Sequence, residues 1–287
     1  LGIGHMDKEA LLAYLNEASI PNSSAQAPYV RSRSMTWQRP FVNSQDLAGT
    51  FSVPAHFTSG HAIGVIAVDL KYPKLPGNVV NATTFDFPVL YKKVEFDIEL
   101  LFEGAPELEM VVVEAAKELE AEGVRAIVGA CGYFAHFQKQ VADAVNVPVF
   151  LRASASFRSS SLALKQEQKI AVFAASADNI DDEILSGVGA QLDDLVIQDV
   201  GSMESFAPIR WGEETFDNKW LTEDLEKTAH DLVEQHPEIG AILLECSDLP
   251  PYAYAIQTAT GLPVFDFITL IKWAHSAVVQ TPYYGYF

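Results

Sequence analysis

The feature that most constrains the fold is an internal repeat. A unit made of a strand, a cysteine, a helix and a second strand occurs twice in the chain. An apolar run from Gly123 leads into Cys131, and a second apolar run from Ile239 leads into Cys246. After each cysteine a helix-like segment ends in a similar short strand, Val-Pro-Val-Phe in one copy and Leu-Pro-Val-Phe in the other, with 17 residues from Cys to Pro in both. We therefore expect two similar lobes, each with its cysteine at the carboxyl end of a parallel strand, where open α/β sheets bind ligands.

The alternation of segment types predicts the fold class. From Ala62 onward, short β-branched runs alternate with amphipathic helical patterns, which is typical of a parallel sheet covered on both faces. We predict an α/β protein of two pseudo-symmetric Rossmann-like lobes, each a mainly parallel sheet flanked by helices, with the active site in the cleft between them. Lobe 1, carrying Cys131, is expected to comprise residues 61–155 and 267–287. Lobe 2, carrying Cys246, is expected to comprise residues 156–266.

The individual elements follow from apolar periodicity and from Gly and Pro positions. The expected strands are Ile63–Val68, Ala126–Ala130, Val147–Leu151, Ile170–Ala174, Leu195–Val200, Ala241–Glu245 and Leu262–Phe265. The expected helices are Pro106–Glu122, the segment after Cys131, one near Asp181 to Ser186, Thr222–Glu234, one beginning at Pro250, and Ile268–Val279. The polar segment Arg152–Ser161 receives no structural prediction.

Residues 1–60 are expected to lie outside the two lobes, as an N-terminal tag and a surface extension. Leu-Gly-Ile-Gly-His-Met resembles a cloning remnant ahead of Met6, so residues 1–5 are not expected to contribute to the fold. One helix-like start, Lys8 to Asn16, precedes a stretch rich in Ser, Pro, Gln and aromatic residues without a sustained period.

Charge and composition exclude several classes of partner. The 38 acidic and 19 basic side chains give a formal net charge of −19, which disfavours binding to nucleic acid. No apolar run reaches the ~18 residues of a membrane span, and the N-terminus lacks a secretory pattern, so we expect a cytoplasmic protein without membrane contact. With two cysteines, no Cys-x-x-Cys and no His cluster, neither a metal site nor a disulfide scaffold is expected. A homo-oligomer remains compatible with the sequence.

The matched cysteines suggest acid–base chemistry at carbon. A thiol reacts as the thiolate, and a helix N-terminus lowers its pKa from the free value of about 8.5, so we expect both Cys131 and Cys246 to be activated in this way. One thiolate would remove a proton next to a carboxylate while the opposite thiol delivers one, which is two-base racemisation without a cofactor. The substrate carboxylate would bind the N–H groups that follow the cysteines, at Gly132, Tyr133, Ser247 and Asp248. The alternative is that each cysteine packs as a small buried hydrophobe.

Further polar residues are candidates for substrate binding, each with a structural alternative. Asp248 would orient a substrate ammonium or assist Cys246, or else cap the helix that starts at Pro250. The Ser247 hydroxyl would bind the substrate carboxylate next to the thiol, or else only cap the helix that follows. The remaining candidates are the loop residues Asn81, Thr83 and Thr84, which are otherwise simply solvated, and Ser176, which is otherwise a turn residue.

The motifs around both cysteines resemble the aspartate/glutamate racemase superfamily, which includes amino-acid racemases, hydantoin racemase, maleate isomerase and arylmalonate decarboxylase. The resemblance covers roughly residues 61–280. The segments that carry it are Leu75–Asn78, Thr83–Val89, Gly129–Tyr133, Leu244–Tyr252, Ala255–Gln257 and Thr260–Asp266. It implies a two-lobed fold with Cys131 and Cys246 as acid and base, and the presence of both cysteines argues against the decarboxylase branch, which keeps one.

Three departures from the family pattern bear on the substrate. The turn Val68–Lys71 is only a weak equivalent of the Asp-Ser-Gly turn of glutamate racemases, and Asp248 stands where those enzymes have His. Both differences weaken glutamate as the substrate. The third departure is the polar segment Arg152–Ser161.

The preferred function on the sequence is racemisation or epimerisation of an amino acid or related α-substituted carboxylate. One alternative uses the same cysteine pair in a lyase or cis-trans isomerase acting on a small carboxylate. A second alternative is a non-catalytic protein that binds a small ligand between its lobes.

Overall fold

The structure is a computed structural model that describes residues 56–156, 164–180, 185, 191–281, 283 and 285–287. Every element below belongs to one compact unit, residues 54–287. Apart from residues 56–60 the predicted extension lies outside the described residues, and so does its helix Lys8–Asn16. The helix expected near Asp181 to Ser186 also lies outside them, except for Leu185.

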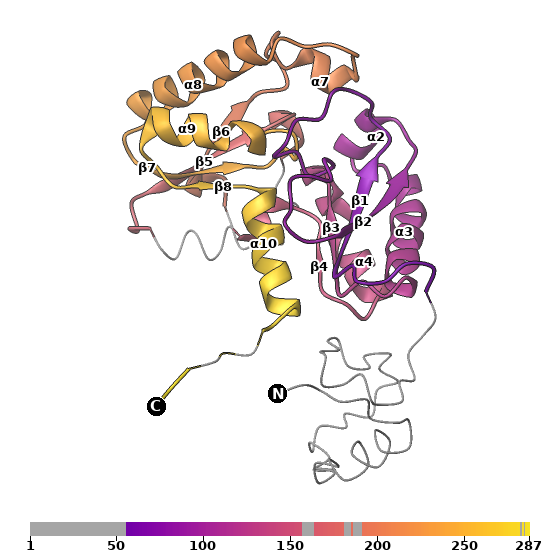
Figure 1. The fold of residues 1–287 in the computed structure, drawn as a ribbon. Coiled ribbons are helices and arrows are strands. Elements are labelled where there is room, and N and C mark those ends of the chain that lie inside the picture. Colours follow the sequence, from indigo (N-terminus) through magenta and orange to yellow (C-terminus); the bar gives the residue numbers. More distant parts are fainter. Residues whose placement is uncertain (1–55, 157–163, 181–184, 186–190, 282, 284) are drawn as a thin grey trace, which may run out of the picture. The chain divides into compact units, whose positions relative to one another are not determined.

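The first lobe is built on a four-stranded parallel sheet (Figure 1). Its strands, in the order in which they lie side by side, are β2 Val89–Val94, β1 Ile63–Val68, β3 Ala126–Gly129 and β4 Val149–Phe150. The central strands β1 and β3 are almost wholly buried, as expected for strands covered on both faces. Their apolar runs therefore predicted them well from the sequence.

Helices cover both faces of this sheet. The elements concerned are α2 Ile98–Phe102, the 3-10 helix η2 Pro106–Leu108, α3 Glu109–Ala121, η3 Gly132–Phe137, α4 Gln138–Ala144, η4 Ala153–Ser156 and α10 Phe267–Val278. On β3, Ile127 packs into the core with α3 and α4, whereas Val128 points to the opposite face and packs with Phe267 and Ile271 of α10. The return of α10 supports the proposal that residues 267–287 belong with lobe 1.

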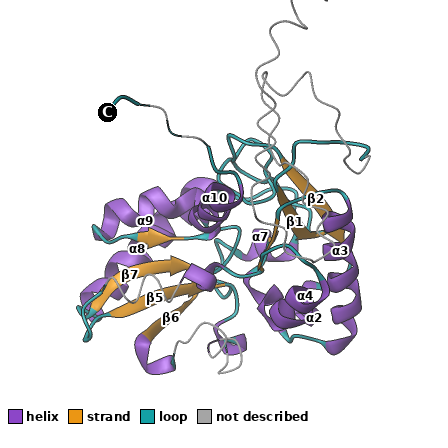
Figure 2. Ribbon diagram, turned by 90° about the horizontal axis from the view of Figure 1, so that it is seen from below, coloured by secondary structure: helices purple, strands orange, loops and turns teal. Residues whose placement is uncertain are grey.

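The second lobe repeats the arrangement. Its parallel sheet runs β6 Leu195–Asp199, β5 Lys169–Ala174, β7 Ile239–Leu244 and β8 Val264–Phe265. The other elements are η5 Ala177–Asn179, η6 Leu192–Asp194, α7 Ala207–Trp211, α8 Asn218–Gln235, η7 Pro250–Tyr252 and α9 Ala253–Thr260. Figure 2 shows α8 and α9 beside each other on one side of this sheet. Helix α8 begins earlier than expected because Asp217 caps it, accepting from the backbone N–H of Trp220 at 3.0 Å.

The internal repeat is visible in the hydrogen bonds of the sheets. In both lobes the strand before the cysteine lies between the first strand of its sheet and the short strand that follows the helix. The amide of Ile127 donates to the carbonyl of Pro148 at 2.9 Å, and the amide of Ile242 donates to that of Pro263 at the same distance. Each donor precedes its cysteine by four residues, so the two copies match residue by residue.

Among the strands and α-helices of the described chain, three were not predicted from the sequence: β2, α2 and α7. Strand β2 lies at the edge of the first sheet and is mostly half-buried, so its Val-Leu-Tyr-Lys-Lys-Val sequence lacks the apolar run of a central strand. The helices α2 and α7 are five residues each, too short to show a periodic pattern. Among the described residues no helix has the length and apolarity needed to cross a bilayer.

Gly201, just beyond β6, lies against the backbone that follows β5. A substitution at Gly201 tests how closely the carboxyl ends of β5 and β6 approach each other. A Cβ at Gly201 would lie 1.8 Å from the carbonyl oxygen of Ala175, so Gly201→Ala must force two backbone segments apart. We predict a loss of about 3 kcal/mol or more in the free energy of unfolding. The control Gly261→Ala meets open space but has a φ of 69°, and should cost about 1–2 kcal/mol. Urea unfolding followed by circular dichroism compares the two, and equal losses would contradict the close approach.

Candidate active site

The structure brings both cysteines to one pocket between the lobes. Cys131 lies two residues beyond β3 and is partly exposed, whereas Cys246 lies two residues beyond β7 and is 8% exposed. Both line the pocket, and neither forms a disulfide. The walls are largely apolar and aromatic, with Phe102 from the first lobe and Phe206 from the second. Both cysteines therefore reach one pocket, as the predicted chemistry requires, while Cys246 also belongs to the apolar core and Cys131 packs against it.

The two thiols have equivalent backbone partners. The backbone N–H of Tyr133 donates to the sulfur of Cys131, and that of Asp248 donates to the sulfur of Cys246, and each contact lowers the thiol pKa. In each copy the donor is the second residue after the cysteine. The repeat therefore extends from the sheets to the chemistry of the site.

The expected lowering of both thiol pKa values is wrong. Burial raises the pKa of Cys131 to about 12, and the negative charges of Asp248 and Glu245 add to this effect. Burial also raises the pKa of Cys246 well above its usual value, and the negative charge of Asp248 raises it further. Each cysteine is followed by a short 3-10 turn before any α-helix begins, so little helix dipole opposes the loss of solvation. Both thiols are consequently neutral in the resting pocket.

Asp248 is the centre of a polar cluster that spans the two lobes. Its Oδ1 accepts from the hydroxyl of Tyr72 in a short hydrogen bond and from the side-chain amide of Asn78 at 2.8 Å. The same amide lies 2.6 Å from the Tyr72 oxygen. The other oxygen of Asp248, Oδ2, accepts from the Cys246 sulfur at 3.7 Å. The predicted capping role is wrong, because the next helical turn has Leu249 at its cap position and no side-chain cap.

Two cationic side chains also line the pocket. Lys74 donates to the carbonyl of Leu70 at 2.8 Å, and its ammonium lies 3.6 Å from the centre of the Tyr72 ring. Burial lowers the pKa of Lys74, while the charge of Asp248 partly opposes this. Arg210 approaches from α7 on the other lobe. The pocket therefore presents positive groups and one carboxylate within largely apolar walls.

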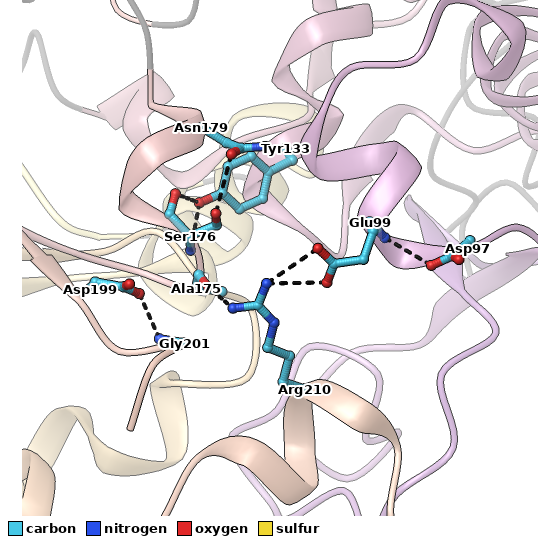
Figure 3. A network of polar contacts seen from close by, with 9 residues as sticks. All are labelled: Asp97, Glu99, Tyr133, Ala175, Ser176, Asn179, Asp199, Gly201 and Arg210. Carbon is cyan, nitrogen blue, oxygen red and sulfur yellow. Dashed lines mark hydrogen bonds and ion pairs between the residues drawn. The ribbon is translucent and has the colours of Figure 1, made fainter. Parts of the chain in front are cut away.

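Two polar links between the lobes lie beside the pocket (Figure 3). Arg210 donates through Nη2 to both carboxylate oxygens of Glu99, at 3.1 and 3.3 Å, and through Nη1 to the carbonyl of Ala175 at 3.2 Å. The Tyr133 hydroxyl donates to the carbonyl of Ser176 in a short hydrogen bond and accepts from the Ser176 amide at 2.9 Å. These contacts hold the carboxyl end of β5 against the first lobe.

The other predicted binding residues have mainly structural contacts. The Ser247 hydroxyl donates across the lobes to the carbonyl of Ala130 at 2.8 Å, although Ser247 itself lines the pocket with Gly132. Ser176 meets Tyr133 through its backbone, and its hydroxyl lies 3.3 Å from Asn179. The structure places three further candidates in hydrogen bonds within the loop after β1, rather than on the pocket wall: Asn81, Thr83 and Thr84.

Sequence reasoning missed Tyr72, Lys74, Asn78 and Arg210. Asn78 ends the segment Leu75–Asn78 that carries the family resemblance, so that segment held a usable signal. Tyr72 and Lys74 lie in a Pro/Gly-rich loop whose path cannot be deduced from periodicity, and Arg210 lies on an unpredicted helix.

One group of described residues has the geometry to share a metal ion, and it lies outside the pocket. His230, Asp231 and Glu234 project from the surface of α8 and bring ligand atoms within 4.8 Å of one another. Exposed acidic clusters of this kind are common without a metal.

The fold and the shared pocket define a two-lobed α/β protein with paired cysteines, and comparison with known proteins identifies its family. A family model described as Asp/Glu/hydantoin racemase matches residues 94–274. The chain belongs to this family.

Two curated relatives each match more than three quarters of this chain. The chain is 31% identical over 233 residues to a dimethylsulfoniopropionate lyase of Durusdinium sp. clade D, covering 78% of this chain and 77% of the relative. It is 29% identical over 236 residues to dimethylsulfoniopropionate lyase 3 of Emiliania huxleyi, covering 78% of this chain but only 61% of that relative.

Among solved structures, the fold is similar to unliganded arylmalonate decarboxylase, with a TM-score of 0.52, 17% identity and coverage of 77% and 94% of the two chains. It is also similar to a glutamate racemase from Bacillus anthracis, with a TM-score of 0.53, 17% identity and coverage of 77% and 82%.

Asp248→Asn tests the contact between Asp248 and the Cys246 thiol. Asparagine keeps an oxygen for Tyr72 but removes the charge that raises the pKa of Cys246. We predict faster alkylation of Cys246 by iodoacetamide at pH 8, by about tenfold for each pKa unit lost. Peptide mass spectrometry measures the rate, and Asp217→Asn, which keeps a residue suited to capping α8, is the control. Unchanged or slower labelling of Cys246 would show that the charge of Asp248 does not disfavour this thiolate.

Proposed function

We propose that this chain is a lyase that removes the proton α to the carboxylate of dimethylsulfoniopropionate and expels dimethyl sulfide. The observation that carries the proposal is the placement of Asp248, which gives Cys246 a proton acceptor at 3.7 Å, whereas Cys131 has no corresponding carboxylate on its own loop. One of the two thiols thus has a hydrogen-bonded carboxylate that can take its proton. The names of the curated relatives support this particular lyase reaction.

The proposed reaction needs one base and no acid at the leaving group. Asp248 takes the proton of the Cys246 thiol, and the resulting thiolate takes a proton from the α-carbon of the substrate. The electron pair of that C–H bond forms the carbon–carbon double bond, and the bond from the β-carbon to sulfur breaks. Its electron pair leaves with sulfur, so the products are acrylate, neutral dimethyl sulfide and one proton.

The pocket has the groups that such a substrate requires. The positive side chains Lys74 and Arg210 suit the carboxylate, and the N–H groups of Gly132 and Ser247 remain proposed donors to it. The aromatic rings of Tyr72 and Phe102 suit a sulfonium cation, as aromatic faces suit other onium groups. The apolar walls also favour the step in which this cation becomes a neutral sulfide.

Racemisation, which the sequence favours, is the second candidate. The equivalent backbone N–H donors at Cys131 and Cys246 support it, because two-base inversion needs two similar thiols. It requires Cys131 to exchange a proton as readily as Cys246 does. The carboxylate at Cys246 makes the two thiols unequal and favours elimination.

Cysteine variants and product analysis test the proposed function. Incubation with dimethylsulfoniopropionate should release dimethyl sulfide, measured by headspace gas chromatography, and acrylate, measured by NMR. Cys246→Ser should lose about 10³-fold in kcat/KM, the effect of removing a general base. Cys131→Ser should lose less, and Thr83→Ala, an exposed loop change, should be unaffected.

The other candidate functions predict different outcomes of the same experiment. Inversion of a D- or L-amino acid with α-hydrogen exchange in deuterated water, without dimethyl sulfide, would support racemisation instead. Ligand binding without turnover, unaffected by Cys131→Ser plus Cys246→Ser, would indicate a binding protein.

A further inference from the structure

Glu245, the residue before Cys246, lies against the loop of the opposite cysteine. It is 7% exposed, and its Oε1 accepts from the hydroxyl of Ser154 at 3.3 Å. A Cβ at Gly132 would lie 2.6 Å from the carbonyl oxygen of Glu245 and 2.9 Å from its Oε1. The carboxyl group of one lobe therefore contacts the residue that directly follows Cys131 on the other.

The second oxygen of this carboxyl group is an unexplained buried polar atom. Oε2 of Glu245 is buried and has no hydrogen-bond partner among the described residues. Burial raises the pKa of Glu245 to about 7, while the nearby Arg152, itself 5% exposed, opposes the shift. A buried acid with an unsatisfied oxygen is costly, so its presence needs a reason beyond packing.

The first residues of the polar segment, Arg152 to Ser154, contact this carboxyl group. Arg152, Ala153 and Ser154 each stabilise the ionised form of Glu245, by charge or by hydrogen bonding. The polar side chains of Arg152 and Ser154, unexpected from the sequence, are explained by this carboxyl group.

The carboxyl group of Glu245 has no counterpart in the other copy of the internal repeat. The residue before Cys246 is Glu245, whereas the residue before Cys131 is Ala130. Both carboxyl groups beside the thiols, Glu245 and Asp248, thus come from the second lobe. Asp248 contacts the thiol of its own loop, and Glu245 faces the loop of the other.

We propose that Glu245 is a positioning residue that holds the Cys131 loop in place and adds to the negative charge that keeps Cys131 a neutral thiol. A negative charge next to the Cys131 loop disfavours a second negative charge on its sulfur. The consequence for catalysis rests on the proposed function: elimination needs a single base, so a Cys131 that stays protonated does not impede it. The effect on thiol reactivity does not depend on which reaction the protein catalyses.

The charged and titratable groups around this pair determine the pH dependence. Those that line the pocket with Cys131 or act on its ionisation are Tyr72, Lys74, Tyr133, Arg210, Glu245, Cys246 and Asp248, and Arg152 faces Glu245. Glu245 acquires its charge as the pH rises through about 7. Its restraint on Cys131 is therefore weak below that pH and complete above it.

Alkylation of the two cysteines tests the proposal directly. At pH 9, Glu245→Gln should speed the reaction of Cys131 with iodoacetamide by about tenfold, corresponding to a pKa lower by about one unit. The rate at Cys246, measured in the same digest by mass spectrometry, should change by less than about twofold. Ser154→Ala removes the hydrogen bond but keeps the charge, so its Cys131 should react at the rate of the unaltered protein.

The unaltered protein supplies a test that does not depend on a variant folding. A plot of the logarithm of the Cys131 alkylation rate against pH should have a slope below one between pH 6 and 8. The reason is that Glu245 ionises in this range, and its charge raises the pKa of Cys131 as the pH rises. Glu245→Gln should restore a slope of one. Equal acceleration of both cysteines in Glu245→Gln would show only that the lobes have loosened, and would overturn the proposal. An unchanged Cys131 rate, or a slope of one in the unaltered protein, would also overturn it.

Discussion

The site depends on the contact between the two loops that come after β3 and β7. The Ser247 hydroxyl donates to the carbonyl of Ala130, and Gly132 lies so close to Glu245 that no side chain fits between them. This contact places both cysteines on one pocket. Burial there has an electrostatic cost, because it raises the pKa of both thiols above their usual values. Any chemistry in the pocket must therefore overcome that cost with a specific partner for one thiol.

Two carboxyl groups of the second lobe lie at this contact, and Asp248 accepts a hydrogen bond from the thiol of Cys246. Asp248 is held by Tyr72 and Asn78 of the first lobe and faces the Cys246 sulfur, whereas Glu245 faces the Cys131 loop. Elimination and racemisation begin with the same loss of an α-proton. They differ in the second step, which is departure of a β-substituent in one case and return of a proton from the opposite side in the other. A pocket in which one thiol, that of Cys246, donates to a carboxylate is suited to the first, which needs a single base.

The sequence predicts the fold well because the decisive strands are buried on both faces and so appear as uninterrupted apolar runs. Cys131 and Cys246 can be placed for the same reason, since each directly follows such a run. Asp248, the partner of Cys246, could be named for its nearness in sequence, whereas Tyr72 and Arg210 could not, because they reach the pocket only through contacts between elements distant in sequence. The thiol pKa values were predicted with the wrong sign, since local sequence suggests a helix N-terminus but not the desolvation imposed by the opposite lobe.

The most direct test of the account uses dimethylsulfoniopropionate carrying two deuterium atoms on its α-carbon. If Cys246 removes an α-proton in the rate-determining step, dimethyl sulfide is released more slowly than from the unlabelled substrate, and the acrylate retains one α-deuterium. Equal rates, with both deuterium atoms retained on a propionate group attached to a cysteine, would indicate nucleophilic displacement at the β-carbon and would contradict the account.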